Sequence, residues 1–221
     1  MGLLRRIETW LHGPTPGWPE RTPFVRLPSG ETVTLRPLRL QDGGEWCRTR
    51  LLDQQWLQPV EPTIHSTWEA AHTKSAWAGQ WTMLKEMAAD GTVVPMVIEV
   101  DGHFAGQLTL GGIQRGTVDE CWIGYWVHRQ YQGRGVATAA CALGVDHAFA
   151  QVGLHRVTAT YLPDNPASGH VLQTVGFREE GFMRGTIHID GRWRDHYFVA
   201  MTEDDYPTTA VDRLRRSGRI R

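Results

Sequence analysis

The sequence predicts a mixed α/β (α+β) fold, in which a single sheet is flanked by helices. Short alternating or β-branched segments recur along the 221 residues, helical patterns separate them, and Gly, Pro and Asn stand at their boundaries. Strands come first, and the second half then reads strand, helix, strand, helix, strand, strand, an order typical of a mixed sheet. With 41% hydrophobic residues, the chain is long enough to bury one full core.

The N-terminal half begins with an extension and continues with a strand and two helices. Residues 2–12 have the pattern of a short amphipathic helix, and the Pro- and Gly-rich stretch from 13 to 28 is typical of a connector. Residues 33–38 alternate like a strand, whereas 42–55 and 67–89 have helical patterns. Five of the ten Trp lie within or between these two helical stretches. We expect them to pack the helices, and the alternative is a floor for a substrate.

The chain from residue 93 onward carries clear turn and capping signals. Asp101-Gly102 predicts a hairpin turn, and so does Asp190-Gly191 between the last two strands. Asn165-Pro166 combines a good N-cap with a residue favoured at the first helical position, and it opens a helix that Gly176 closes. The other expected elements are strands at 93–100, 104–110, 120–127 and 156–161 and a helix from 135 to 152.

Composition excludes several classes of protein. A net charge of −1 gives no reason to expect binding to DNA or to a membrane, and no apolar run approaches the roughly 18 residues of a membrane helix. The three Cys lie far apart without a CxxC motif, which favours a reducing cytoplasm over a disulfide framework or a zinc site. No His lies in a metal-ligand pattern such as HExxH, so we expect no metal.

The strongest chemical signal is the segment from Gln130 to Thr138, QYQGRGVAT, between a predicted strand and a predicted helix. Gly133 and Gly135 allow a ligand to approach the backbone closely. The helix then begins with free N–H groups and the positive end of its dipole, a combination that binds anions and suits a pyrophosphate. A dinucleotide fingerprint would need Gly in place of Thr138, and a P-loop would need a nearby Lys. The alternative interpretation is a glycine-rich helix entry that binds no ligand.

This loop resembles that of the Gcn5-related N-acetyltransferases (GNAT), which carry (Gln/Arg)-x-x-Gly-x-(Gly/Ala) at such a junction. The resemblance covers about residues 30–205. Ile123-Gly124-Tyr125-Trp126 is similar to the family's splayed strand. The stretches that resemble the RimJ/RimL-like branch, which acetylates ribosomal-protein N-termini, are Asn165-x-x-Ser168, Val175-Gly176-Phe177, Glu180-Gly181 and Asp190-Gly191-x-Trp193-x-Asp195.

The resemblance implies a mostly antiparallel central sheet with a V-shaped splay between its two central strands, and acetyl-CoA as cosubstrate. In this family the loop amides hold the coenzyme A pyrophosphate, and the splayed strand lines the pantetheine arm. A backbone amide near Trp126 or Val127 is expected to stabilise the oxyanion. The residues assigned to the coenzyme are Trp126, Val127, Gln132, Gly133, Arg134, Gly135, Val136, Ala137, Thr138, Asn165 and Ser168.

Proton transfer is assigned less directly. Ser168 is the candidate donor to the leaving thiolate, although its hydroxyl could instead only cap the helix. Asn165 is expected to bond the pantetheine arm as well as to cap. Glu120 is the candidate general base and would act through a water that it holds. The alternative is that Glu120 is only an exposed residue at the end of its strand. Glu180 and His188 are weaker candidates for the base.

The predicted activity is acetyl transfer to an α-amine, with Ala or Ser at the N-terminus of a ribosomal protein as acceptor. A small-amine acetyltransferase and a non-catalytic acyl-CoA-binding module are the alternatives. We expect a cytoplasmic monomer or homodimer with an N-terminal extension (1–28), an acetyltransferase domain (29–206) and a basic C-terminal tail (207–221). The five Arg after Asp212 are interpreted as a solvated tail, the alternative being a contact with ribosomal RNA or an acidic partner.

Overall fold

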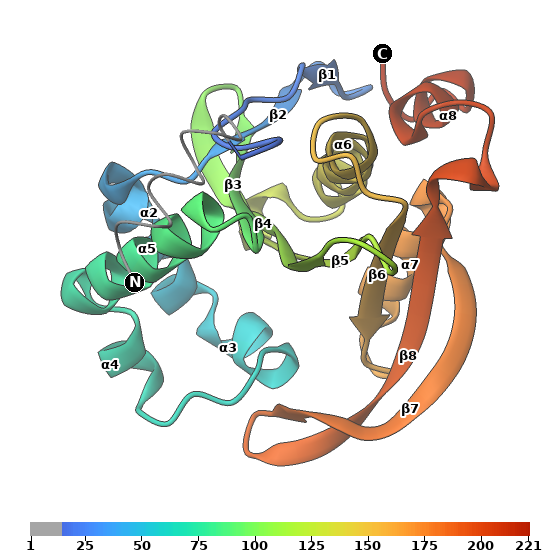
Figure 1. Ribbon diagram of the computed structural model, residues 1–221. Helices are drawn as coiled ribbons and strands as arrows, with labels where there is room; N and C mark the ends of the chain where they lie inside the picture. Colours follow the sequence, from blue (N-terminus) through green and yellow to red (C-terminus); the bar gives the residue numbers. More distant parts are fainter. Residues whose placement is uncertain (1–14) are drawn as a thin grey trace, which may run out of the picture.

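The computed structural model describes residues 15–221, so the helix expected at 2–12 lies outside the described residues. In the described chain, eight strands form one sheet in the order β1-β2-β3-β4-β5-β6-β8-β7 (Figure 1). Neighbouring strands are antiparallel except for β5 and β6. The strands are β1 (Val25–Arg26), β2 (Thr32–Pro37), β3 (Val93–Val100), β4 (His103–Gln114), β5 (Glu120–Val127), β6 (Arg156–Tyr161), β7 (Arg178–Ile189) and β8 (Arg192–Thr202). The predicted mixed, mostly antiparallel sheet is thus confirmed.

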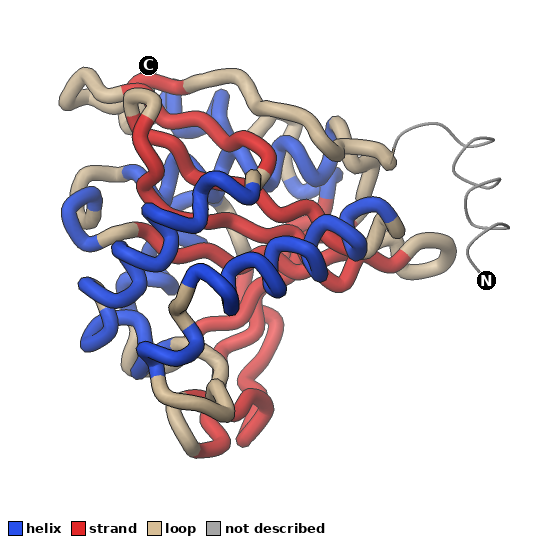
Figure 2. Tube along the Cα trace, turned by 90° about the vertical axis from the view of Figure 1, so that its left-hand side faces the viewer, coloured by secondary structure: helices blue, strands red, loops and turns tan. Residues whose placement is uncertain are grey.

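Helices cover both faces of the sheet. Helices α2, α3, α4 and α5 lie on one face, which we call the α2–α5 face, and Figure 2 shows them in front of the strands. Helices α6, α7 and α8 lie on the other, the α6–α7 face. The helices are α2 (Gly43–Leu52), α3 (Gln54–Leu57), α4 (Trp68–Ala71), α5 (Lys74–Ala89), α6 (Val136–Ala150), α7 (Pro166–Val175) and α8 (Ala210–Arg216). Single 3₁₀ turns are η1 (Leu40–Asp42), η2 (Gln58–Val60), η3 (Arg129–Tyr131) and η4 (Glu203–Asp205).

Each face has its own buried cluster. The larger cluster joins the strands to α6, whose small residues allow the helix to lie close to the sheet. A Cβ on Gly144 would lie only 2.9 Å from Leu108 Cδ1, so a side chain there would push the helix away. The smaller cluster joins Trp46 of α2 and Trp77 of α5 to β3 and β4. The expectation that tryptophans pack the helical segment is confirmed for these two, which are 2% exposed.

Local signals placed most element boundaries correctly. Asp101 and Gly102 have φ values of +48° and +83°, as a tight hairpin turn requires. Asn165 caps α7 by accepting a hydrogen bond from the Ser168 N–H, and Gly176 ends the helix in a left-handed conformation. The helix expected over 67–89 is divided in two, because the Thr73 side chain accepts from the Ala76 N–H and so begins a new helix.

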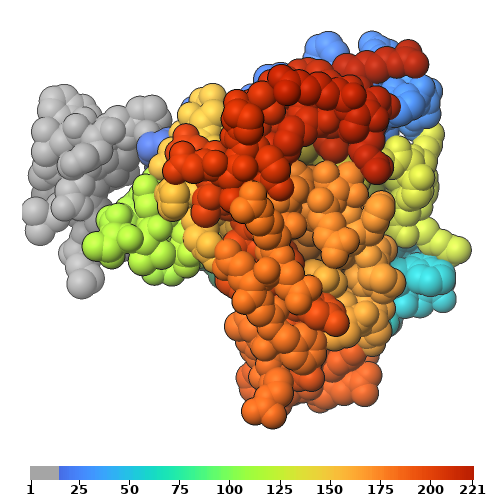
Figure 3. Space-filling view, turned by 90° about the vertical axis from the view of Figure 1, so that its right-hand side faces the viewer, coloured from blue at the N-terminus to red at the C-terminus, as the bar shows by residue number. Residues whose placement is uncertain are grey.

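The C-terminal segment is not the solvated tail that its arginines suggested. Helix α8 packs against α6 and buries Leu214, and Ile220 beyond it is 3% exposed. Arg213 donates to the carbonyl of Val175 and lies 3.8 Å above the Tyr206 ring, whereas the other four arginines are exposed. The apolar positions between the arginines hold this segment on the fold, where it forms a continuous surface in Figure 3.

In residues 15–221, every helix is too short or too polar to cross a membrane.

Candidate active site

The loop after β5 has the geometry of an anion site. Gly133 and Gly135 have φ values of +71° and +86°, which favour glycine. A Cβ on Gly133 would meet nothing within 4 Å, so the space before the loop is open. Gly135 is the N-cap of α6, and neither a side-chain cap nor an acidic residue occupies the first turn. The first N–H groups therefore point into an open, electropositive space.

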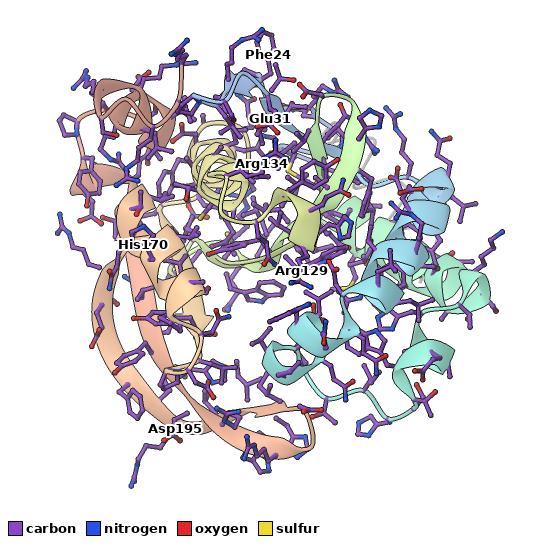
Figure 4. The ribbon with its side chains drawn as sticks, turned by 180° about the vertical axis from the view of Figure 1, so that it is seen from behind. Phe24, Glu31, Arg129, Arg134, His170 and Asp195 are labelled. Atoms are coloured by element: carbon purple, nitrogen blue, oxygen red, sulfur yellow. The ribbon has the colours of Figure 1, made fainter. Side chains whose placement is uncertain are left out.

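Side chains of the loop hold it in place. The Gln132 side-chain amide donates to the Val127 carbonyl at 3.2 Å and ties the loop to the end of β5. Arg134 forms an ion pair with Glu31 of the β1–β2 turn, and Figure 4 shows the two at the same edge of the loop. Val136 is 1% exposed and anchors the helix start in the core, so only its backbone is available to a ligand.

Strands β5 and β6 separate to form the expected splay. They pair in parallel at three positions, from Glu120↔Arg156 to Trp122↔Thr158, and then diverge. Beyond this point β6 pairs only with β8. One edge of β5 is therefore open from Ile123 onward, and its peptide groups face a gap that leads to the glycine loop.

The alternation of the strand decides which amides face the gap. The His128 N–H donates to Ala105 of β4, and β4 and β5 stay in register from Gly106↔Val127 to Gly111↔Trp122. Because peptide groups alternate in direction along a strand, the Trp126 N–H also points to β4, whereas that of Val127 points to the gap. Of the two candidate amides for the oxyanion, only the N–H of Val127 faces the gap, so Val127 is the remaining candidate.

The α6–α7 side of the gap carries two hydroxyl groups. Tyr125 OH lies 3.5 Å from Ser168 Oγ and 3.4 Å from its carbonyl oxygen. Burial raises the pKa of Tyr125, so this phenol stays protonated at any working pH. Asn165 supplies the helix cap, and the Ser168 hydroxyl is left to face Tyr125. The arrangement offers proton donors beside the open edge of β5. The coenzyme contact expected for Asn165 stays a prediction.

The α2–α5 side is built around one buried arginine. The Arg50 guanidinium, whose side chain is 8% exposed, lies 5.1–5.3 Å from the ring centres of Trp46, Trp68 and Trp126. It donates to both carboxylate oxygens of Glu61 at 2.9 and 2.5 Å. We call these residues, together with His72, the Arg50 cluster. It connects Trp126 on the splayed strand to the segment after α3.

His72 completes the Arg50 cluster. Its Nε2 accepts from Arg50 Nε at 2.7 Å, so its Nδ1 carries the proton and donates to the Trp68 carbonyl. Burial lowers the pKa of His72, which keeps the ring neutral beside the guanidinium. A second buried contact joins α2 to the end of β5: Asp53 Oδ2 accepts from His128 Nδ1 at 2.7 Å and from the Arg129 N–H at 2.8 Å.

A cavity of about 430 Å³ lies between the segment 54–69 and the β7–β8 turn. The turn is held there by Gln58, which donates to Asp190, and by Thr63, whose Oγ1 accepts from the Gly191 N–H. Glu61 contributes to the wall, so the Arg50 cluster borders this cavity. The charged residues of the lining are all acidic: Glu61, Glu69 and Asp190.

Comparison with known proteins decides the family. A family model described as an acetyltransferase (GNAT) domain matches residues 32–178, more than half of the chain. The chain belongs to the GNAT acetyltransferases. Mycobacterium smegmatis RimJ, solved in complex with CoA-disulfide, has 45% sequence identity and a TM-score of 0.91, covering 93% of this chain and 98% of that one.

Two curated GNAT relatives are similar over most of their length. The [ribosomal protein uS5]-alanine N-acetyltransferase of Escherichia coli is 27% identical over 192 residues, which cover 86% of this chain and 97% of that enzyme. The spermidine N(1)-acetyltransferase of Escherichia coli is 27% identical over 190 residues, which cover 81% and 91%. The resemblance to the RimJ/RimL-like branch is confirmed.

Within this GNAT domain, the base candidates lie apart from the hydroxyl pair. Glu120 stands at the closed end of the splay, where its carboxylate is 3.4 Å from Arg156 Nε. The same guanidinium binds Glu180, and His188 is bonded to Thr63 at the cavity. These contacts do not test a role for Glu120 as base, which stays a prediction.

Several residues of this site carried no signal in the sequence. Arg50 and Glu61 belong to no motif, and their meeting depends on how the segment after α3 folds back. Tyr125 stood in the splayed-strand motif, but its pairing with Ser168 depends on the approach of α7. Cys121 and Cys141 are small core residues, and burial raises the pKa of Cys121 to about 12. Residues 15–221 hold no group of three potential metal ligands.

Proposed function

We propose that this GNAT enzyme transfers the acetyl group of acetyl-CoA to the α-amine of an N-terminal Ala or Ser on a ribosomal protein. The observation that supports it most is similarity along nearly the whole chain to RimJ and to a uS5-alanine N-acetyltransferase. With a ribosomal protein as acceptor, the reaction takes place in the cytoplasm.

The residues present fit coenzyme A. A pyrophosphate requires converging N–H donors and no competing carboxylate, and the start of α6 supplies both conditions. The pantetheine arm requires exposed peptide groups, which the open edge of β5 offers. In this assignment Gly133, Gly135 and the first turn of α6 bind phosphate oxygens, and Asn165 bonds the arm.

The chain needs few catalytic groups, because a thioester is already reactive. The neutral amine attacks the carbonyl carbon directly in a ternary complex, the C–N bond forms, and the C–S bond breaks. The Val127 N–H would stabilise the oxyanion. Ser168 would donate a proton to the leaving thiolate, with Tyr125 beside it, and the proton that the amine loses passes to solvent.

An α-amine suits a site without a strong base. With a pKa of roughly 7.7–8.0, about a fifth of α-amines are neutral near pH 7.3, compared with about one in a thousand Lys side chains. That difference corresponds to about 3 kcal/mol. Glu120, the leading base candidate, is paired with Arg156, which is consistent with an acceptor that needs little help in losing its proton.

Acetylation of a small polyamine is the second candidate. The similarity to a spermidine N(1)-acetyltransferase favours it. Glu69 and Asp190 in the lining of the cavity also favour it, because their carboxylates would attract a cation, whereas Glu61 is already paired with Arg50. It explains less of the comparison, because the 45% identity to RimJ is considerably higher.

Direct competition tests the acceptor. A peptide with a free N-terminal Ala is mixed with the same peptide blocked at its α-amine and carrying a free Lys, and with spermidine. Mass spectrometry then locates the acetyl group. We expect the N-terminal Ala to be modified first. Acetylation of Lys alone or of spermidine alone contradicts the proposal, and absence of thiol release with every amine indicates a non-catalytic module.

A further inference from the structure

Trp122 presents an exposed aromatic surface at the point where the sheet opens. It is the last residue of β5 that pairs with β6, opposite Thr158, and it is 48% exposed. Strand alternation places its side chain on the α2–α5 face, with Gly124 and Trp126 next along that face. Its ring offers a large, rigid apolar surface to a ligand that approaches the opening.

The indole is held in a slot formed by three glycines. A Cβ on Gly111 would lie 2.2 Å from its Cζ2, one on Gly112 would lie 2.8 Å from its Nε1, and one on Gly124 would lie 3.3 Å from its Cζ3. The first two distances are shorter than any packed contact, so the ring rests directly on the backbone of β4. Its orientation is therefore fixed before any ligand arrives, while its outer side stays open.

The geometry of the splay directs the acceptor to this surface. The hydroxyls of Tyr125 and Ser168 lie on the α6–α7 side of the gap, so we expect the nucleophile to approach from the α2–α5 face. On that face Trp126 is covered by Arg50, whose guanidinium lies 5.2 Å from its ring centre. Gly124 has no side chain. Trp122 is thus the exposed side chain of β5 beside the opening.

We propose that Trp122 is the floor on which the first residues of the acceptor peptide lie. The inference rests on the proposed function and names the residue that sets affinity for the peptide. The indole face contacts the small first side chain and attracts the ammonium form of the α-amine, since cations within roughly 6 Å of a Trp ring are stabilised. The absence of a side chain at Gly124 leaves the amine a path to the thioester.

Steady-state kinetics with a peptide bearing a free N-terminal Ala test the assignment. We expect Trp122→Ala to raise the peptide KM about tenfold, the effect of losing a central aromatic contact, and to leave kcat nearly unchanged. Coenzyme A affinity, measured by calorimetry, should match that of the wild type, because the coenzyme lies along the edge of β5. Trp122→Phe keeps a ring over the glycines and should restore most of the affinity.

Two controls make the outcome specific. Phe24→Ala removes an exposed aromatic beside β1, 63% exposed and far from the splay in Figure 4, and should change neither constant. Trp122→Leu keeps an apolar side chain without a π face, and it replaces Trp122→Ala in the comparison if that variant unfolds. An unchanged peptide KM in the folded variant overturns the inference, as does an equal loss of coenzyme A affinity. A wild-type enzyme that acetylates spermidine but no peptide overturns the proposed function itself.

Discussion

On the α6–α7 face of the splay, binding groups come from the backbone and from the hydroxyls of Tyr125 and Ser168. On the α2–α5 face they come from indole, guanidinium and carboxylate groups. The glycine loop offers N–H groups at positions where side chains would interfere. The Arg50 cluster instead stacks three indoles around one guanidinium and locks it with a carboxylate.

The difference separates binding of the coenzyme from stability of the fold. The glycine loop is exposed and contributes little buried surface, so changes there should affect ligand affinity more than folding. The Arg50 cluster is buried and joins α2, α4 and β5, so changes there should affect folding and the acceptor side together. Variants on the two faces should therefore separate into two classes.

The largest effect is expected for Arg50→Ala. It leaves Glu61 without its partner and opens a gap among the indoles, and breaking a buried pair in this way costs about 4 kcal/mol. Chemical denaturation measures the loss. Arg48→Ala on the same helix is the matched control: Arg48 is half-exposed and paired with Glu45, so its loss should cost under about 1 kcal/mol. Equal losses in the two variants would contradict a central role for the cluster.

The second effect is loss of coenzyme binding in Gly135→Glu. A carboxylate beside the pyrophosphate opposes it by about 4 kcal/mol at an effective dielectric constant of 20, which corresponds to roughly a thousandfold in affinity. Gly153→Glu is the matched control, because Gly153 follows the other end of α6 and has a φ of +72° with open space around it. Calorimetry should show weak binding only in Gly135→Glu. Unchanged affinity in that folded variant removes the loop from the site.

The same contrast explains what the sequence could predict. The glycine loop, the caps of α7 and the hairpin turns each depend on a local conformation, which restricts residue types at fixed spacing. Such positions were placed within one or two residues. The splay and the mostly antiparallel order came from the family resemblance, since strand order is not encoded locally.

The Arg50 cluster could not be predicted, because its members are far apart in sequence and meet only when α2, α4 and β5 pack together. Trp126 was assigned to the coenzyme, but its indole lies under Arg50 and its N–H points to β4. The C-terminal arginines led to a wrong prediction, that of a solvated tail. Charge dominated its composition, whereas the apolar Leu214 and Ile220 determine where the segment packs.

The third prediction concerns Ser168→Ala, which should lower kcat roughly a hundredfold if the hydroxyl donates a proton to the thiolate. Asn165 provides the cap, so the helix should survive the change. Tyr125→Phe separates the two hydroxyls, and a smaller loss is expected because Ser168 is retained. Single-turnover measurements show whether chemistry limits the rate. An unchanged rate in Ser168→Ala together with a large loss in Tyr125→Phe transfers the role to Tyr125.

The smallest effect is expected for Glu120→Gln, and it tests whether the closed end of the splay takes part in the reaction. If Glu120 holds a water that accepts the amine proton, the loss should be greatest at low pH, where little of an amine with a pKa of roughly 7.7–8.0 is neutral. Glu180→Gln is the matched control, because both carboxylates bind Arg156.

A structural role for Glu120 would act through that shared guanidinium, so the two variants would then lose similar activity at every pH. A base would produce a pH-dependent loss in Glu120→Gln alone. The ratio of variant to wild-type kcat/KM across the pH profile distinguishes the two. A flat ratio assigns Glu120 to the ion pair, and the amine must then lose its proton to water alone. That result would also strengthen the assignment of an α-amine acceptor, since a Lys amine with a pKa of about 10.4 would be almost fully protonated throughout that range.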